Sequence, residues 1–152
     1  MPVLLKPNAT NNCFGCGGAN ARGMQLTFEQ DDAARRIRGS FRLSSDYQGG
    51  TGFVHGGIVA TLLDEVMAKV SRFEGDHAVT GELTVEYVKP VPVDRDLLVE
   101  GWEIERNGRN LLRQGEIRDA SGALLARGKG RFVQIDVEAL RKKLGANEQA
   151  KH

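Results

Sequence analysis

Two adjacent acids in the middle of an apolar segment are the residues most able to do chemistry. Asp64 and Glu65 lie in the run FVHGGIVATLLDEVMAKV, which spans residues 53–70. A carboxylate in such surroundings can serve as a general base or as a nucleophile, because neighbouring groups can shift its proton affinity. A helix enclosed by a sheet has to be apolar nearly all round, so both acids need an explanation.

Helical geometry separates the two acids, because consecutive residues of a helix point about 100° apart. Glu65 lies one turn before Lys69, in the order that forms a modest surface ion pair. A surface ion pair with Lys69 is therefore a sufficient reason for an acid at Glu65, whereas Asp64 has no cation within reach on its own helix. Of the positions three, four and seven residues from Asp64, all except Met67 are small: Gly57, Ala60, Thr61, Ala68 and Ser71.

An unpaired carboxylate among small apolar residues is costly unless its pKa rises or another segment supplies a partner. Such an acid is a candidate for a functional site. The alternative is that Asp64 bonds a backbone amide or a side chain in a subunit interface. The acid by itself leaves both interpretations open.

The start of the helix offers a second chemical group. His55, Gly56 and Gly57 place unhindered backbone N–H groups in a first turn whose donors lack intrahelical partners and whose dipole favours negative charge. Such a terminus can polarise a carbonyl and hold a developing oxyanion. The alternative for the two glycines is close packing only.

The spacing of these two groups predicts an assembly. Gly56 and Asp64 are eight residues apart, which is about 12 Å along a helix. A carbonyl held at Gly56 is too far from Asp64 of the same chain for an attack geometry near about 3 Å. If both groups act on one substrate, the acid comes from a second subunit, and we expect a dimer with composite sites.

The remaining pattern predicts one long helix, residues 58–70, among six strands. An Asn107-Gly108 pair indicates a tight hairpin between two of the strands. One helix against such a sheet is typical of an α+β domain with the helix on the concave face. The expected strands span residues 24–30, 35–44, 77–91, 96–106, 110–120 and 123–135.

The strand at 77–91 alternates strictly between apolar and polar residues, which predicts two distinct faces. Val79, Leu83, Val85 and Tyr87 are expected on one face, and Thr80, Glu82, Thr84 and Glu86 on the other.

Composition narrows the class of protein. The chain of 152 residues fits one domain, and its 21 Lys and Arg against 20 Asp and Glu give no general affinity for nucleic acid or an anionic membrane. No apolar run reaches the length of a signal peptide or a membrane span, so we expect a cytoplasmic protein. We expect an N-terminal loop segment at 1–24, the main domain at 25–135 and a short basic helix with a tail at 136–152.

The two cysteines, Cys13 and Cys16, lie in the segment NNCFGCGGAN. A zinc ribbon needs about four ligands, and His55, His77 and His152 form no second pair. We therefore expect neither a metal nor another cofactor. A glycine-rich turn with two half-buried thiols is preferred over a reversible disulfide and over a metal site.

These motifs together resemble the hotdog-fold acyl-CoA thioesterases, specifically the phenylacetate-pathway-like subgroup. The resemblance is carried by Tyr47-Gln48-Gly49, by His55-Gly56-Gly57 and by Asp64 nine residues after the histidine. The strand TGELTVEYVKPV, with its Tyr two residues before a Lys-Pro pair, supports it, as does the N-terminal CFGCG. The resemblance covers about residues 13–133, and its specific part is 47–67.

The resemblance implies a hotdog fold, with one long central helix wrapped by a curved antiparallel sheet, in homodimers that often pair into homotetramers. It implies an acyl-CoA substrate whose thioester carbonyl is polarised by the Gly56 amide. Asp64 of the neighbouring subunit is then the general base or nucleophile, and Thr80 positions the water.

In the family that the chain resembles, many members carry an Asn six residues before the histidine, where this chain has Gly49. The resemblance therefore assigns Gln48 to the missing amide's place, and His55 either to the site or to capping the helix. Gly49, Gly57 and Thr61 are expected to contact the substrate. The alternatives are a non-catalytic acyl-CoA-binding domain and an acyl-thioester dehydratase that uses His55 with Asp64.

Overall fold

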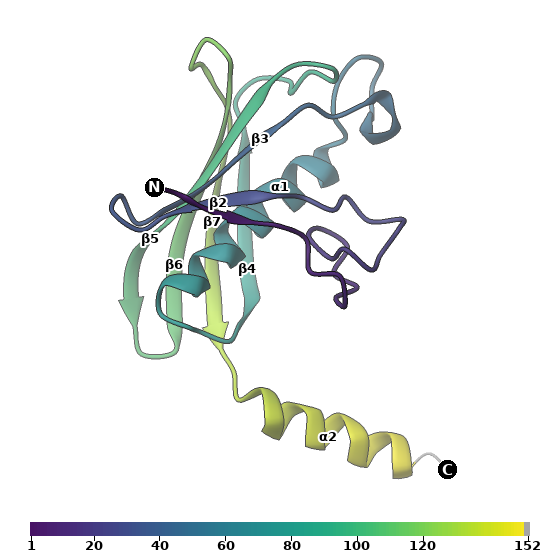
Figure 1. Cartoon of the computed structure of the whole chain (residues 1–152), viewed down its shortest axis with the longest axis vertical. Helices are drawn as coiled ribbons and strands as arrows, with labels where there is room; N and C mark the ends of the chain where they lie inside the picture. The colour runs from purple at the N-terminus through teal and green to yellow at the C-terminus, as the bar shows by residue number, and fades with distance from the viewer. Residues whose placement is uncertain (151–152) are drawn as a thin grey trace.

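The computed structural model describes residues 1–150, in which one antiparallel sheet of seven strands curves around a long helix (Figure 1). The strand order is β1-β2-β3-β5-β6-β7-β4. The strands are β1 (Val3–Leu5), β2 (Phe28–Asp31), β3 (Arg36–Phe41), β4 (Ala78–Tyr87), β5 (Leu97–Asn107), β6 (Asn110–Asp119) and β7 (Leu124–Gln134). The helices are α1 (Gly56–Lys69), continued by the 3-10 turn η2 (Val70–Phe73), and α2 (Val137–Ala150), with a further turn η1 (Ser45–Tyr47).

The predicted α+β architecture is confirmed, as is the hairpin at Asn107-Gly108, where Gly108 has a φ of 59°. The strand expected at 24–30 is largely wrong, because Met24 and Leu26 donate backbone hydrogen bonds to the N-terminal loop rather than to a strand. That N-terminal segment also contains β1. Helix α2 extends away from the sheet (Figure 1), and residues 151–152 of the expected tail lie outside the described part.

A lane of glycines lets α1 lie unusually close to the sheet. Gly101 pairs with Gly115, and Gly115 with Gly128, across three neighbouring strands. A Cβ on Gly101 would lie 2.9 Å from the Val66 carbonyl oxygen, which only a shift of the helix backbone could relieve. The lane therefore fixes the distance between α1 and the sheet.

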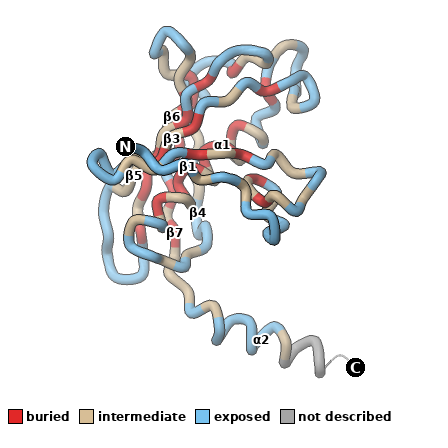
Figure 2. The backbone as a smooth tube through the Cα atoms, viewed as in Figure 1, coloured by how far each residue is buried: buried red, intermediate tan, exposed pale blue. Residues whose placement is uncertain are grey.

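The apolar side of α1 fills the concave face of the sheet. Leu62, Leu63, Val66 and Met67 are fully buried, and the tube view shows buried residues along α1 and the strands that it faces (Figure 2). Each such side chain contributes about 1.5–3 kcal/mol relative to its exposed state. This packing holds in place the polar residues on the remaining face of α1.

The predicted alternation of β4 holds from Glu82 to Tyr87 but is wrong for Val79 and Thr80, because a bulge at Gly81 changes its phase. Thr80 pairs with Phe132 and Glu82 with Arg131, which leaves Gly81 without a partner position. A bulge residue moves the following side chains to the other face of a strand. Thr80 therefore faces α1 on the same side as Leu83.

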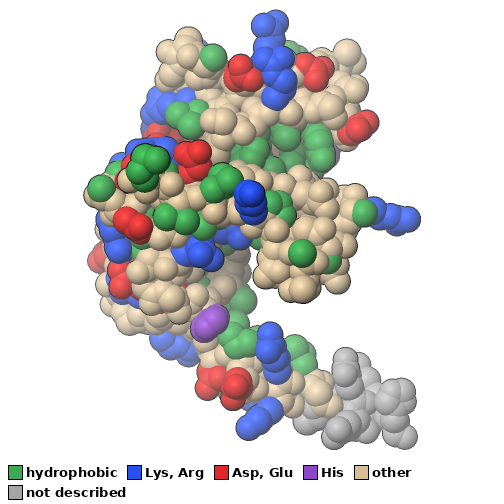
Figure 3. Space-filling model, viewed as in Figure 1, with side chains coloured by type: hydrophobic (Ala, Val, Ile, Leu, Met, Phe, Trp, Pro, Cys, Tyr) green, Lys and Arg blue, Asp and Glu red, His purple; other side chains and the backbone are tan. Residues whose placement is uncertain are grey.

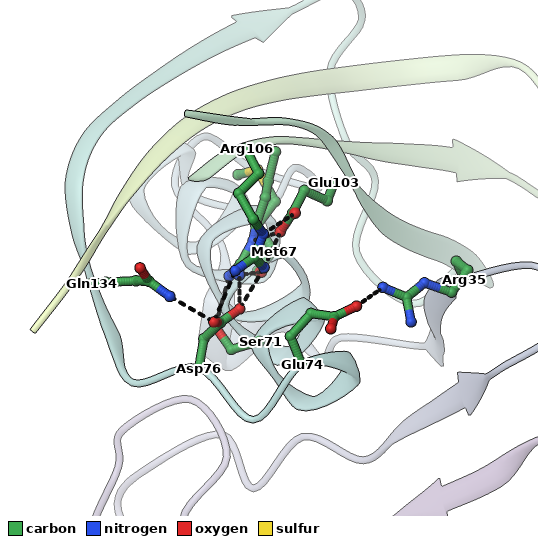
Figure 4. A network of polar contacts seen from close by, with 9 residues as sticks. Arg35, Met67, Ser71, Glu74, Asp76, Glu103, Arg106 and Gln134 are labelled. Carbon is green, nitrogen blue, oxygen red and sulfur yellow. Dashed lines mark hydrogen bonds and ion pairs between the residues drawn. The ribbon is translucent and has the colours of Figure 1, made fainter. Parts of the chain in front are cut away.

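A buried arginine anchors the C-terminal end of α1. The Arg113 side chain is fully buried, and its Nη1 donates to the Met67 carbonyl (3.0 Å) and to the Ser71 hydroxyl (2.8 Å). A cation there complements the negative end of the helix dipole. Asp76 lies 3.5 Å and Glu103 3.4 Å from the guanidinium, and Figure 4 shows this network around Asp76.

Arg106 completes the network with a two-point contact to Asp76, at 3.0 and 2.7 Å. This hydrogen bonding holds the pKa of Asp76 below its ordinary value of 3.8. Acidic and basic side chains are otherwise interspersed over the face seen in Figure 3. Within residues 1–150, no helix combines the length and the apolar character needed to cross a membrane.

Candidate functional site

The first turn of α1 is capped by the histidine that precedes it. The His55 Nδ1 accepts a hydrogen bond from the Gly57 N–H at 2.9 Å, and the His55 carbonyl accepts from the Ile58 N–H. The His55 N–H itself donates to the Tyr47 carbonyl. Among the described residues, the Gly56 N–H has no hydrogen-bond acceptor, unlike the other N–H groups of this turn. It is therefore free to bind a ligand oxygen.

Tyr87 of β4 holds the same turn from the side. Its hydroxyl donates to the Gly56 carbonyl at 2.7 Å, and a Cβ on Gly56 would lie 3.5 Å from that hydroxyl. The sequence placed Tyr87 only on a face of a strand. The signal that could have found it is its position close before Pro90, one of the features that carry the family resemblance.

The loop before α1 folds into a tight turn beside the cap. The Gln48 Oε1 accepts from the Gly52 N–H at 3.2 Å, and Gly49 donates to the Phe53 carbonyl. Gly49 lies against His55, so closely that a Cβ would be 3.2 Å from the histidine Cα. Gln48 and Gly49 are both exposed, beside the first turn of α1.

Asp64 lies farther along the same face of α1 and has a partner on β4. It is half-buried, and its Oδ1 accepts a hydrogen bond from the Thr80 hydroxyl at 2.7 Å. The bulge at Gly81 is what turns Thr80 toward this acid. Thr61 lies between the two ends of the site and donates to the Gly57 carbonyl.

The predicted residues thus form two groups on one face of α1. Gln48, Gly49, His55 and Gly56 surround the helix start, whereas Asp64 and Thr80 meet two turns later. β4, an edge strand of the sheet, flanks both groups and exposes Val79 (46%) and Tyr87 (53%), and Val88 just after it is also exposed (42%). A cavity of about 590 Å³ elsewhere in the chain touches none of these residues.

The predicted ion pair between Glu65 and Lys69 is wrong. In the described part of the chain, Glu65 instead accepts from the Cys13 thiol (3.3 Å), and Lys69 donates to the Cys16 sulfur (3.1 Å). Burial, together with the nearby Glu65 carboxylate, raises the pKa of the Cys16 thiol to about 12. Both cysteines are half-buried and free, as predicted.

The sequence around this arrangement matches a known protein family. A family model described as "Thioesterase superfamily" matches residues 51–126, half of the chain. The chain belongs to the thioesterase superfamily. The matched segment contains α1 and β4, and with them His55, Gly56, Asp64 and Thr80, whereas Gln48 and Gly49 precede it.

Individual relatives agree with this superfamily. The acyl-coenzyme A thioesterase THEM4 of Rattus norvegicus is 28% identical over 115 residues, which cover 75% of this chain and 50% of that protein. The corresponding proteins of Xenopus laevis and Mus musculus match over 46% and 50% of their lengths. The chain therefore spans about half the length of the curated relatives it matches.

Solved structures of other proteins share the fold. Protein RHA08564, a thioesterase superfamily protein, matches with a TM-score of 0.75 and 31% identity, covering 80% of this chain and 60% of that chain. The smu.793 protein of Streptococcus mutans, solved bound to acetyl CoA, matches with a TM-score of 0.63 and 20% identity over 66% and 81% of the two chains. The fold is the hotdog fold.

Proposed function

We propose that this superfamily member hydrolyses acyl-CoA thioesters to a free carboxylic acid and coenzyme A. The proposal rests on two groups that lie on one face of α1. One is the Gly56 amide, which stays free while Gly57 donates to His55, and the other is the Asp64 carboxylate, which accepts a hydrogen bond from Thr80. Thioester hydrolysis needs an oxyanion donor and a base or nucleophile, which these groups supply. The names of the relatives and the acetyl CoA bound to the Streptococcus protein support the substrate class.

In the proposed reaction the Gly56 N–H binds the thioester carbonyl oxygen and stabilises the negative charge that develops on it. Asp64, acting as base, takes a proton from water, and the hydroxide attacks the carbonyl carbon. The carbon–sulfur bond of the tetrahedral intermediate then breaks, and the leaving coenzyme A thiolate takes the proton that Asp64 accepted from water. Thr80 holds the Asp64 carboxylate through one oxygen, which leaves the other oxygen for the water. Attack by Asp64 itself, followed by hydrolysis of the anhydride, uses the same groups.

The two groups belong to different subunits in this proposal. They are about 12 Å apart along α1, whereas the reacting atoms have to come within about 3 Å. The exposed apolar residues of β4 support a second copy at this edge, since an unpaired edge strand readily pairs with another strand. We therefore propose a homodimer, or a homotetramer built from it, in which Gly56 of one chain faces Asp64 of the partner.

The role of the histidine favours hydrolysis over dehydration. A dehydratase needs His55 as a base, but its Nδ1 is engaged as the cap of α1 and accepts from Gly57. The neutral ring then carries its proton on Nε2. Gln48 and Gly49, which lie beside this cap, are proposed to border the acyl end of the substrate together with Thr61 and Gly57.

The test is thiol release from short, medium, long and aromatic acyl-CoAs by wild type and by Asp64→Asn. The change keeps the shape of Asp64 and removes its basicity, so hydrolysis is expected to fall by about 10²-fold or more. Asp96→Asn, at an exposed acid paired with Arg42, is the matched control. Full activity in Asp64→Asn would refute the assigned base, and saturable binding without turnover in wild type would identify an acyl-CoA-binding domain instead.

A further inference from the structure

The N-terminal loop and the outer side of α1 bring three metal-binding side chains together, away from the site just described. The sulfurs of Cys13 and Cys16 and a carboxylate oxygen of Glu65 all lie within 4.8 Å of one another. All three residues are half-buried. A tetrahedral zinc with a zinc–sulfur bond of about 2.3 Å separates neighbouring ligand atoms by about 3.5–3.8 Å, which is close to the 3.3 Å between Cys13 and Glu65.

The loop is shaped to hold these groups at that spacing. The Gly17 N–H donates to the Cys13 carbonyl (2.9 Å), and the Cys13 N–H donates to the Asn11 side chain (2.6 Å). Gly15, between the two cysteines, gives up its side-chain space to Glu65, whose Cγ and Cδ occupy the place of a Cβ at 2.3 Å. Local hydrogen bonds and a required glycine thus aim the loop at the Glu65 carboxylate.

We propose that Cys13, Cys16 and Glu65 bind a thiophilic divalent cation, with zinc as the expected ion and water as the fourth ligand. Thiolate ligands select zinc over magnesium or calcium, and three protein ligands plus water are an established zinc coordination. A cavity of about 460 Å³, lined among others by Cys16 and Lys69, gives the ion a route from solvent. The cation fastens the N-terminal loop to the middle of α1.

Lys69 completes the charge balance of this site. The three ligands in their metal-binding forms carry three negative charges, one more than the cation neutralises. The Lys69 ammonium, 3.1 Å from the Cys16 sulfur, supplies the missing positive charge and a hydrogen bond to the bound thiolate. Such outer partners tune metal affinity by about 10–100-fold.

A simple redox pair explains the cluster less well. In the structure each sulfur bonds a charged side chain rather than the other sulfur, Cys13 to Glu65 and Cys16 to Lys69. A redox pair also gives no role to Glu65, which lies against both cysteines. A bound cation displaces the thiol protons and uses all three side chains.

The test is metal binding by the full chain, reduced and stripped of metal. Titration with cobalt is expected to give one equivalent per chain, with a thiolate-to-cobalt charge-transfer band that one equivalent of zinc abolishes. Zinc is expected to raise the melting temperature by about 5–10 °C when it is about 100-fold above its Kd. These readouts are independent of hydrolysis and of the proposed function.

Variants separate the three-ligand site from other outcomes. Cys13→Ser and Cys16→Ser are expected to abolish the charge-transfer band or halve it, and Glu65→Gln to weaken zinc binding by at least about tenfold. Glu74→Gln, the same change just beyond α1 at a residue paired with Arg35, should bind zinc as wild type does. Glu65→Gln also keeps both thiols if the serine variants fail to fold.

Three results would overturn the proposal. One is the absence of the band in folded, reduced protein. Another is zinc affinity that is equal in Glu65→Gln and wild type, which would show adventitious binding by two thiols. The third is a disulfide between the cysteines, found by thiol titration and intact mass, that forms as readily with zinc bound as without it.

Discussion

The hydroxyl of Thr80 offers a sharp test of the proposed chemistry, because Thr80→Val removes one hydrogen bond and almost no volume. The bond to the Asp64 carboxylate is short, at 2.7 Å, and bonds to charged groups contribute about 1.5–3 kcal/mol. Thr80 is exposed in the single chain, so we take the lower end, about 1.5 kcal/mol. If this bond orients Asp64 in the transition state, kcat falls about tenfold with little change in KM.

The assay is steady-state thiol release with the best acyl-CoA of the panel, together with urea unfolding and measurement of the oligomeric state. Thr84→Val is the control, since Thr84 is exposed on the opposite face of the same strand. In an Asp64→Asn background, Thr80→Val should add nothing, because the two residues act as one unit. A Thr80→Val enzyme within twofold of wild type would refute the positioning role, whatever its stability.

Three further predictions address the frame around the site. Gly101→Ala should lower the free energy of unfolding by about 1–3 kcal/mol, since the new Cβ meets the Val66 backbone. The control is Gly145→Ala, where the new Cβ has open space. Equal melting temperatures for the two variants would contradict the close approach of α1 to the sheet. Arg106 holds the pKa of Asp76 below 3.8, so the contact between them stabilises the fold fully above that pH and is lost as pH falls through the lowered pKa. Asp76→Asn should therefore destabilise the protein at about pH 6 and much less near pH 3, as measured by urea unfolding. Tyr87→Phe should lower kcat/KM by about 2–10-fold in the thiol-release assay, and a change in stability alone would assign Tyr87 to the fold.

Much of the architecture could be predicted because it depends on local signals. The apolar run after His55 specifies α1, and the Asn107-Gly108 pair specifies its hairpin whatever the rest of the chain does. The acid worth testing also followed from local geometry, since Asp64 has no cation one turn away. Its partner did not, because Thr80 reaches Asp64 only through the bulge at Gly81, and strict alternation assigned Thr80 to the other face.

The second acid shows the limit of such local reasoning. Along α1, Glu65 and Lys69 look like an exposed ion pair, and that inference considers only the helix. A loop about fifty residues earlier lies over both side chains and replaces their mutual contact with Cys13 and Cys16. The cysteines alone lacked enough ligands for a metal, and the glutamate alone had a sufficient explanation. The candidate cation site exists only because the fold brings the cysteines and the glutamate together. The third ligand comes from α1, and no spacing in the sequence shows that α1 lies next to the loop.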